Sequence, residues 1–377
     1  MKHWSGVILL ALAPFACGTR ADHEPVDLLP GDYFDVYADG DALQLLALGE
    51  SGLLYRRSDD AGVTWADAVP PDFLAEASAP FGHEVRVAAR GKRVVALWAT
   101  RGTGFEGSGP LVSALSADGG RTWRLGPNPA DDGSTEGHGF IDVFSSGDAF
   151  HTVWLDGRDG SQGLRYARSA EGTRWEANVS IDAETCECCW NTLAATQDDL
   201  YVLYRDKAPR DMAIAVSEDH GESFRRLGFV GEFDWLIEAC LHVGGGMVAS
   251  DETLHTVVWT GRDGAVGIYY LRSLDGGSTW SAPFRLGDES ARHADIAVSD
   301  EGRLAIVWDA TEDERRRVRT VVSPDGGQSW AAPMATPYGG RSNHHPRVVA
   351  TSRGFMAFWS AVAAEEQVIV GYRLSAY

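Results

Sequence analysis

Short apolar segments recur along the chain, and most of them end in an aromatic residue just before a polar loop. Six segments show this pattern most clearly: Arg93–Trp98, Phe150–Trp154, Leu200–Tyr204, Leu254–Trp259, Leu304–Trp308 and Phe355–Trp359. Each follows another apolar run, which is typical of neighbouring β-strands. The pattern therefore predicts an all-β protein made of repeated strand units.

A second pattern, a turn that contains Asp and Gly and ends in an aromatic residue, separates these units. Its copies begin 48 to 58 residues apart, at Ser58, Ser116, Ser169, Ser217, Ser273 and Ser323. We expect the Asp to accept hydrogen bonds from the backbone, the Gly to take a positive φ, and the aromatic residue to pack beneath the next blade. The copy at Ser169 is one residue short and has Glu171 in place of Asp, so its turn should be distorted.

The spacing of the turns is that of a four-stranded propeller blade. The chain has six turns but seven sets of three strands, and the last set, residues 346–374, ends without a fourth strand. A segment around Glu24–Leu29 would supply that strand and close the ring, which removes an open sheet edge. We therefore predict a single β-propeller over residues 22–377, with seven blades favoured and six as the alternative.

These turns resemble the Asp-box (BNR) repeats of the sialidase-like β-propeller superfamily, and the resemblance covers nearly all of residues 22–377. For activity it implies a glycosidase site with an arginine triad, a Tyr–Glu nucleophile pair and an acid/base Asp. The chain offers Arg86 and Arg347 in innermost strands, with Asp142 as a carboxylate. A third arginine and the Tyr–Glu pair are not evident. The cysteine and histidine segments also resemble those of secreted bacterial Asp-box proteins.

Residues 1–21 have the features of an export signal. Lys2 precedes an apolar run, Val7–Ala13, that is too short to span a bilayer. The segment around Cys17 resembles a lipoprotein processing site, and cleavage after Ala21 would instead release a soluble protein. We expect a periplasmic, outer-membrane-anchored or secreted protein, in a compartment that permits disulfides. A membrane contact is expected only through a lipid anchor at Cys17.

The charge balance limits the partners. The chain has 33 basic and 54 acidic residues, a formal net charge of -21. Nucleic acid and anionic membrane surfaces would repel such a protein. The expected partner is a small molecule, a glycan or a metal ion, bound by a monomer.

Cysteine and histidine gather at one position of the repeat, about 15 to 19 residues before the aromatic end of each second strand. In a propeller this loop enters the innermost strand and opens onto the central channel. Eight of these residues form the predicted metal site: Cys186, Cys188, Cys189, Cys240, His242, His293, His344 and His345. Thiolate and imidazole ligands favour Cu(I) first and Zn(II) second.

Further side chains are predicted to line a pocket at the same face. Trp190 and Trp235 lie beside the cysteines and have no place in the repeat pattern, so they suggest a pocket wall. The other predicted pocket residues are the two remaining loop histidines and three arginines that follow second strands: His83, His138, Arg158, Arg205 and Arg262.

Three functions remain open. The thiols and imidazoles bind a soft metal ion or act as a redox site. Alternatively, the four cysteines beyond residue 21 form two disulfides, since an even number in an oxidising compartment permits this, and the propeller is a carbohydrate-binding module. In the third function the protein is a sialidase-like glycoside hydrolase.

Overall fold

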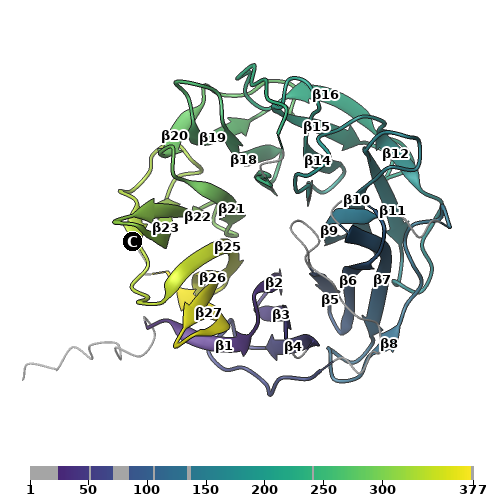
Figure 1. Cartoon of the computed structure of the whole chain (residues 1–377), viewed down its shortest axis with the longest axis horizontal. Coiled ribbons are helices and arrows are strands. Elements are labelled where there is room, and N and C mark those ends of the chain that lie inside the picture. The colour runs from purple at the N-terminus through teal and green to yellow at the C-terminus, as the bar shows by residue number, and fades with distance from the viewer. Residues whose placement is uncertain are drawn as a thin grey trace, which may run out of the picture.

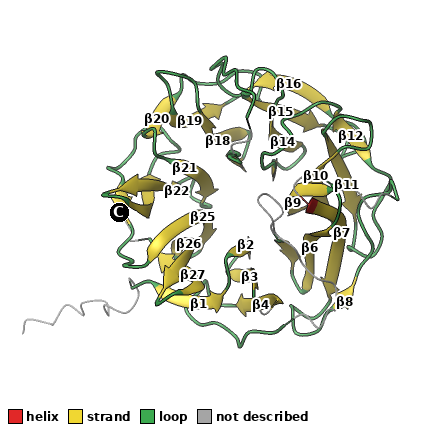
Figure 2. Ribbon diagram, in the orientation of Figure 1, coloured by secondary structure: helices red, strands yellow, loops and turns green. Residues whose placement is uncertain are grey.

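The protein is described by a computed structural model that covers residues 24–50, 52–70, 85–104, 107–133, 137–239 and 242–374. Over these ranges the strands form seven antiparallel sheets arranged in a ring, and no α-helix occurs (Figures 1 and 2). The predicted all-β class and the seven-bladed propeller are confirmed, and the six-bladed alternative is wrong. Residues 1–21, His83 and Cys240 lie outside the described ranges.

The first three blades contain strands β2 to β12. Blade 1 has β2 (Tyr33–Asp39), β3 (Ala42–Gly49) and β4 (Gly52–Ser58), extended by a single bridge between Tyr55 and Val69. Blade 2 has β5 (Arg86–Arg90), β6 (Arg93–Arg101), β7 (Ser108–Ser116) and β8 (Arg124–Leu125). Blade 3 has β9 (His138–Ser146), β10 (Ala149–Asp156), β11 (Gly163–Ser169) and β12 (Val179–Asp182).

The next three blades contain strands β13 to β24. Blade 4 has β13 (Thr192–Ala195), β14 (Leu200–Arg205), β15 (Met212–Ser217) and β16 (Arg225–Phe229). Blade 5 has β17 (Gly246–Ser250), β18 (Thr253–Thr260), β19 (Gly267–Ser273) and β20 (Phe284–Gly287). Blade 6 has β21 (Arg292–Val298), β22 (Leu304–Glu312), β23 (Arg315–Ser323) and β24 (Met334–Ala335).

Blade 7 combines strands from both ends of the described chain. It has β25 (Arg341–Thr351), β26 (Gly354–Ala363), β27 (Glu366–Arg373) and, as its fourth strand, β1 (Val26–Pro30). β1 runs antiparallel to β27, with Val26 opposite Gly371 and Pro30 opposite Val368. The segment that pairs here overlaps the one predicted from the sequence, residues 24–29.

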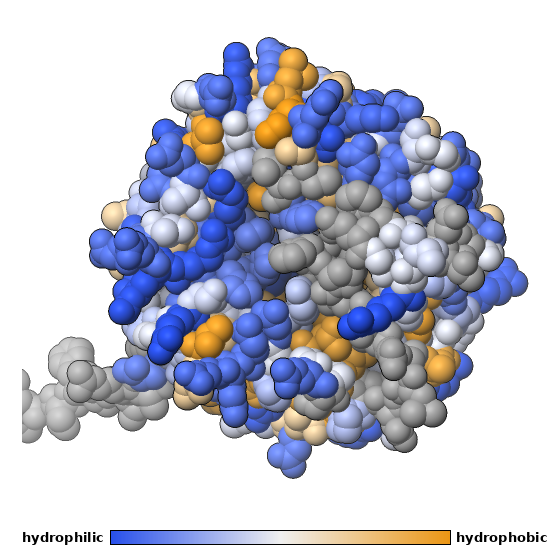
Figure 3. Space-filling view, viewed as in Figure 1, coloured by the Kyte–Doolittle hydropathy of each residue, from blue (hydrophilic) through white to orange (hydrophobic). Residues whose placement is uncertain are grey.

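The apolar core lies between neighbouring blades. One cluster joins Val95 and Leu97 of blade 2 to Ile141, Phe150 and Trp154 of blade 3. The aromatic ends of the second strands are among the most deeply buried side chains, namely Trp98, Trp154, Tyr204 and Trp359. Hydrophilic residues predominate on the face shown in Figure 3, in keeping with the high charge of the chain.

The Asp turns have the predicted hydrogen bonds. In the turn at Ser116, Asp118 accepts hydrogen bonds from the Ser116 hydroxyl at 2.8 Å and from the Thr122 backbone N–H at 2.9 Å. Hydrogen bonds from Thr122 and Ser116 lower the pKa of Asp118 to about 2. The same arrangement recurs at Asp60, Asp219, Asp275 and Asp325. In the shortened copy the Ser169 hydroxyl donates to the Arg174 carbonyl instead, so this turn differs as expected.

The aromatic residue of each turn packs against the preceding blade, not the next one as the sequence suggested. Trp123 of blade 2 contacts Tyr55 of blade 1, with ring centroids 5.0 Å apart. Phe224 of blade 4 contacts Tyr166 of blade 3 at 4.8 Å. The turn follows the third strand and leads to the outer edge of the blade. Its aromatic side chain therefore packs on the preceding blade. These contacts tie each blade to its predecessor.

Two buried histidines should make the stability of the propeller depend on pH. His151 and His255 occupy equivalent positions in blades 3 and 5, and each forms a 2.7 Å hydrogen bond with a tyrosine hydroxyl. Burial lowers the pKa of each histidine to about 4, whereas an unfolded histidine titrates near ~6.5. The unfolded state therefore binds the proton first, and stability is lost as the pH falls from about 6.5 to about 4.

We expect each histidine to contribute up to about 3 kcal/mol to this loss, because one pKa unit corresponds to about 1.4 kcal/mol. Denaturant unfolding at pH 7 and pH 5 measures it. His255→Gln should flatten the pH dependence, whereas His220→Asn, at an exposed turn position, should not. An unchanged pH dependence in His255→Gln would contradict the assignment.

Candidate functional site in the axial channel

One position in the innermost strand of six of the seven blades supplies a layer of mostly charged residues around the axis. This position pairs with the residue just before the aromatic end of the second strand, as in Asp142 opposite Val153 and Arg347 opposite Phe358. We define the charged layer as Asp35, Arg86, Asp142, Thr192, Asp295 and Arg347. Aspartate and arginine therefore alternate around much of the ring.

The aspartates of this layer also join neighbouring blades. Asp35 accepts a hydrogen bond from the backbone N–H of Val87 in blade 2 at 3.0 Å. Asp142 accepts one from Leu193 N–H in blade 4 at 2.7 Å, and Asp295 accepts one from Val348 N–H in blade 7 at 2.8 Å. Each carboxylate thus satisfies a backbone donor that would otherwise face the channel.

The two arginines compensate these carboxylates. Arg347 lies 3.2 Å from Asp35 and 3.6 Å from Asp295, and Arg86 lies 3.8 Å from Asp142. Burial raises the pKa of Asp142 to about 6, opposed by the charges of Arg86 and Arg347. Burial raises the pKa of Asp295 as well, opposed first by Arg347. The layer therefore holds three carboxyl groups and two guanidinium groups in close electrostatic contact.

A second layer of ring side chains lies two residues before the charged one. We define the ring layer as Tyr33, Phe140, Trp190, His293 and His345. Four of its members are in contact: the Trp190 ring lies 5.9 Å from His293, 5.8 Å from His345 and 6.0 Å from Phe140, and the two histidines lie 4.1 Å apart. His242 joins this group from blade 5, 6.5 Å from Trp190.

Several ring residues have a left-handed backbone. The φ angles are 53° at Phe140, 50° at His242, 48° at His293 and 49° at His345. Non-glycine residues seldom adopt this conformation, and it costs energy that surrounding structure must offset. It recurs at the ring-layer position of blades 3, 6 and 7 and at His242 of blade 5, and it orients the rings that gather around Trp190. Such strain concentrates at functional sites.

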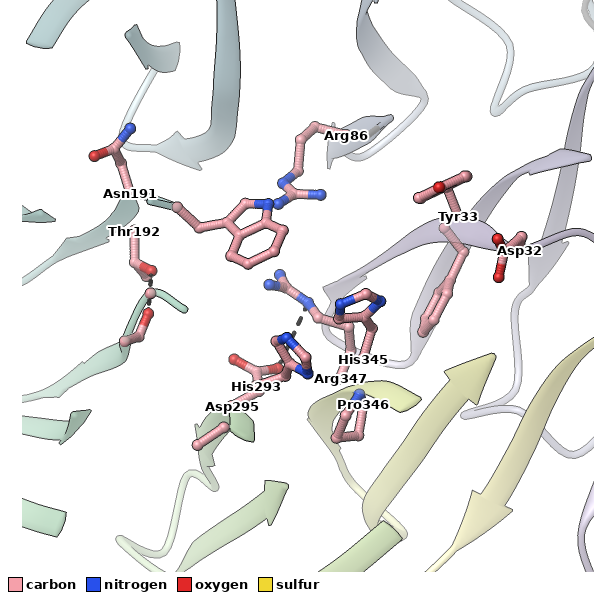
Figure 4. A pocket seen from close by; sticks show the side chains of 15 residues that line it. Asp32, Tyr33, Arg86, Asn191, Thr192, His293, Asp295, His345, Pro346 and Arg347 are labelled. Carbon is pink, nitrogen blue, oxygen red and sulfur yellow. Dashed lines mark hydrogen bonds and ion pairs between the residues drawn. The ribbon is translucent and has the colours of Figure 1, made fainter. Parts of the chain in front are cut away.

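Residues from both layers line a cavity that is partly open to solvent, with an empty volume of about 670 Å³ when the open solvent at its mouth is included. Figure 4 shows Arg86 and Arg347 extending toward the same space, with His293 and His345 beside Arg347 and with Tyr33 across from them. The principal polar and aromatic lining residues are Asp32, Tyr33, Arg86, Trp190, His293, Asp295, His345 and Arg347.

Asp309 holds the two cavity histidines in place. Its side chain is fully buried, and Oδ2 lies 2.7 Å from His293 Nδ1 while accepting a hydrogen bond from the His345 backbone at 3.0 Å. Arg316 forms an ion pair with the other oxygen. Burial, and then the nearby His293 and His344, lower the pKa of His345 well below its usual value. His345 is therefore a neutral imidazole at neutral pH, beside two guanidinium groups.

The cysteines form a separate group behind Trp190. Cys186, Cys188 and Cys189 are at most 2% exposed and are free thiols. Cys186 Sγ lies 2.8 Å from Cys189 Sγ and 3.9 Å from Cys188 Sγ. They pack in the cluster between blades 3 and 4 that includes Phe140. Hydrogen bonds from its two neighbours lower the pKa of Cys186, whereas burial raises the pKa of Cys189.

The predicted Cys/His set is thus divided in two within the described residues. The three thiols lie within 4.8 Å of one another, and no described histidine belongs to that group. His344 and His345 contact each other, with Nδ1 atoms 3.2 Å apart, on the cavity side. Phe140 and Trp190 pack on the thiol cluster and also contact His242, so an aromatic wall lies between the sulfur and imidazole groups.

Comparison with known proteins gives the fold. No protein-family model matches the chain, and no curated protein matches it. Solved structures do: the endosialidase of phage phi92 (11% identity, 94% of this chain and 70% of that chain, TM-score 0.52) and the polysaccharide lyase Uly1 (11%, 96% and 94%, 0.55). A third is the Hadza microbial sialidase Hz136 (14%, 88% and 73%, 0.50). The chain has the sialidase-like propeller fold. At these identities the likeness concerns the fold alone.

The remaining predicted pocket residues of this sialidase-like propeller lie outside the cavity lining. Arg205 is buried and donates to the carbonyls of Val243 and Trp259, with its guanidinium over the Trp235 ring. Arg262 donates to the Phe233 carbonyl. These arginines follow second strands as expected, but short loops hold them against the adjacent backbone.

In blade 3 of the propeller, His138 and Arg158 form a compact network. His138 lies 3.3 Å from Asp132 and 4.0 Å from Asp156, and Arg158 pairs with Asp131 and Asp156 at 2.8 Å each. Asp132, His138 and Asp156 are the second group of close potential metal ligands among the described residues. Arg158, together with Arg165 at 3.3 Å from Asp156, offsets part of the carboxylate charge of this network.

Sequence reasoning missed three cavity residues, Asp32, Tyr33 and Asp295. A signal for Asp295 was present, because aligning the innermost strands on the aromatic ends of the second strands places it with Asp35 and Asp142. The same alignment places Tyr33 in register with Trp190. The sequence also contained a C-x-x-C spacing, Cys186 to Cys189, which the tighter C-x-C-C pattern obscured.

Proposed function

We propose that the protein binds the acidic sugar of a polysaccharide in the axial cavity and cleaves the chain there. The observation that carries this proposal is the convergence of Arg86 and Arg347 on a cavity that also contains aromatic and imidazole side chains. Guanidinium groups recognise carboxylates through paired hydrogen bonds, and the Trp190 ring gives a surface for the apolar face of a sugar. The solved structures of this fold include sialidases and a polysaccharide lyase, which supports the choice of substrate class.

The lining favours elimination over hydrolysis through a carboxylate pair. Glycosidases of the usual kind place two free carboxyl groups across the scissile bond. Among the described lining residues, the acidic side chains are Asp32 and Asp295, and Asp295 already binds Val348 N–H and Arg347. No glutamate lines the described part of the cavity, so a Tyr–Glu nucleophile pair is not formed there.

Elimination needs a cation that neutralises a uronate carboxylate and a base for the proton on the adjacent carbon. Arg86 and Arg347 supply the cations, and His345 supplies a neutral imidazole. In the step, the imidazole takes the proton from the carbon that bears the carboxylate, a carbon–carbon double bond forms, and the neighbouring carbon–oxygen bond breaks. The leaving oxygen takes a proton from the Tyr33 hydroxyl, which lies across the cavity from His345.

The test uses the full chain and a panel of sialylated and uronate-containing oligosaccharides, each paired with its carboxyl-reduced counterpart. We expect the acidic uronate ligands to bind by calorimetry and the reduced ones not to bind. Cleavage should yield an unsaturated product that absorbs in the ultraviolet. Equal binding of both forms, or of neither, would overturn the carboxylate site. Release of a saturated acidic sugar would overturn the elimination step and leave hydrolysis in its place.

A further inference from the structure

We infer that Cys186, Cys188 and Cys189 form a three-coordinate site for a soft monovalent metal ion, Cu(I), on the far side of Trp190 from the cavity. We infer this site from the thiols and their surroundings alone, without the proposed polysaccharide chemistry. The structure contributes what the sequence could not, namely which of the predicted ligands are brought together. They are the three thiols alone, and not the mixed cysteine and histidine set.

The sulfur positions suit three-fold coordination. Three sulfurs bound about 2.3 Å from one ion lie about 4 Å apart. Cys186 Sγ and Cys188 Sγ are 3.9 Å apart, and all three sulfurs lie within 4.8 Å of one another. The Cys186–Cys189 separation of 2.8 Å has to widen by about 1 Å. The loop carries consecutive thiols at Cys188 and Cys189, so small side-chain rotations are sufficient.

A buried guanidinium group offsets the charge that such a site accumulates. Arg210 Nη1 donates to Cys186 Sγ at 3.0 Å, and its Nη2 lies 3.1 Å from Glu187. The Arg210 side chain is about nine-tenths buried, where a cation without anionic partners is costly. Glu187 supplies one anionic partner, and the hydrogen bond from Arg210 to Cys186 Sγ fixes the position of this ligand.

The number of donors selects the metal. Structural Zn(II) takes four ligands in a tetrahedron, whereas the described residues offer three thiols here, and no described carboxylate or imidazole lies within 4.8 Å of all three sulfurs. Thiolate sulfur favours Cu(I) among the ions that tolerate three-fold coordination. The apolar surroundings from blades 3 and 4, including Leu155, Leu164 and Tyr204, exclude the water that would otherwise complete a tetrahedron.

The test titrates the reduced full chain with Cu(I) under anaerobic conditions, against a chromophoric Cu(I) chelator. We expect one tightly bound Cu(I) per chain, with sulfur-only coordination by X-ray absorption. Cys186→Ser, Cys188→Ser and Cys189→Ser should each remove this binding. Arg210→Gln should weaken it by about 10- to 100-fold, the range for groups that support a metal ligand. His138→Gln, in the other group of potential ligands, is the matched control and should bind normally.

Circular dichroism and thermal unfolding confirm that each variant is folded, and Arg210→Gln tests the site with all thiols intact. Absence of Cu(I) binding by the reduced wild type would overturn the inference, as would binding that survives all three cysteine substitutions. A Cys186–Cys189 disulfide that persists under reducing conditions, detected by mass spectrometry after alkylation, would also overturn it. Preferential uptake of Zn(II) would overturn the choice of metal. Oligosaccharide binding by Cys188→Ser, measured in parallel, separates a failure here from a failure of the proposed function.

Discussion

Replacing His345 with asparagine is expected to slow the cleavage of a uronate polysaccharide by about 100- to 10,000-fold, the range for loss of a general base. Asparagine suits this position because the backbone has a φ of 49°, which asparagine tolerates better than most residues. KM should change little, since Arg86 and Arg347 remain to bind the carboxylate. Separate measurement of kcat and KM tests this split.

The pH profile of the same variant gives an independent readout. The lowered pKa of His345 means that the wild-type rate persists as the pH falls through about 6.5, and declines only when the imidazole gains its proton. In His345→Asn this acid limb should disappear from the residual rate. The control is His220→Asn, which removes a histidine with a similar φ of 59° from an exposed turn. Equal losses in both variants, or a kcat unchanged in His345→Asn, would refute the role of His345.

Replacing Arg347 with methionine is expected to abolish most of the affinity for acidic oligosaccharides. Truncating one partner of a charge pair that the bound ligand buries costs about 2–5 kcal/mol, which corresponds to a roughly 30- to 5000-fold weaker Kd. Methionine keeps the length of the side chain and removes its charge. Calorimetry with a uronate oligosaccharide measures the change, and Arg86→Met tests the second cation independently.

The Arg347 variant also disturbs the propeller itself. Asp35 and Asp295 lose the guanidinium group that lies 3.2 and 3.6 Å away, so thermal stability should fall. Arg347→Lys keeps the charge without the planar fork and should retain the fold with intermediate affinity. Arg303→Met removes an arginine of similar exposure that pairs with Glu301 outside the cavity lining, and it is the matched control. Wild-type affinity in folded Arg347→Met would remove the carboxylate site from the cavity.

The fold was predictable because the spacing of the turns and the pattern of apolar residues in the strands indicate the same architecture. The Asp turns fix the blade period, and the aromatic ends of the second strands fix the register within each blade. That register was sufficient to locate Arg86, Arg347 and Asp142 near the axis. Asp295 of blade 6 occupies the same position in that register. The direction of aromatic packing was wrong, because a turn motif does not show which neighbour its side chain reaches.

The candidate site was predictable only in part. Cys189 and Trp190 are consecutive, and the loop position alone suggested that thiols and imidazoles would share one site. Which side chains reach the cavity depends on the backbone, because a positive φ at His293 and His345 directs these rings to the axis. A positive φ at a non-glycine residue has no local signal in the sequence. The thiols precede the ring layer by one to four residues and enter the core between blades instead. Side chains at similar loop positions therefore enter either the axial cavity or the core between blades.

The peptide bond between Cys189 and Trp190 joins the two proposed sites mechanically. Trp190 contacts His293 and His345 in the cavity, while the preceding residue belongs to the thiol cluster. A sugar in the cavity or an ion at the thiols that shifts this segment changes the binding free energy at the other site. By thermodynamic reciprocity, the two changes are equal. If sugar affinity rises by some factor when the sulfurs hold an ion, the ion must be retained more tightly by that same factor when sugar is bound.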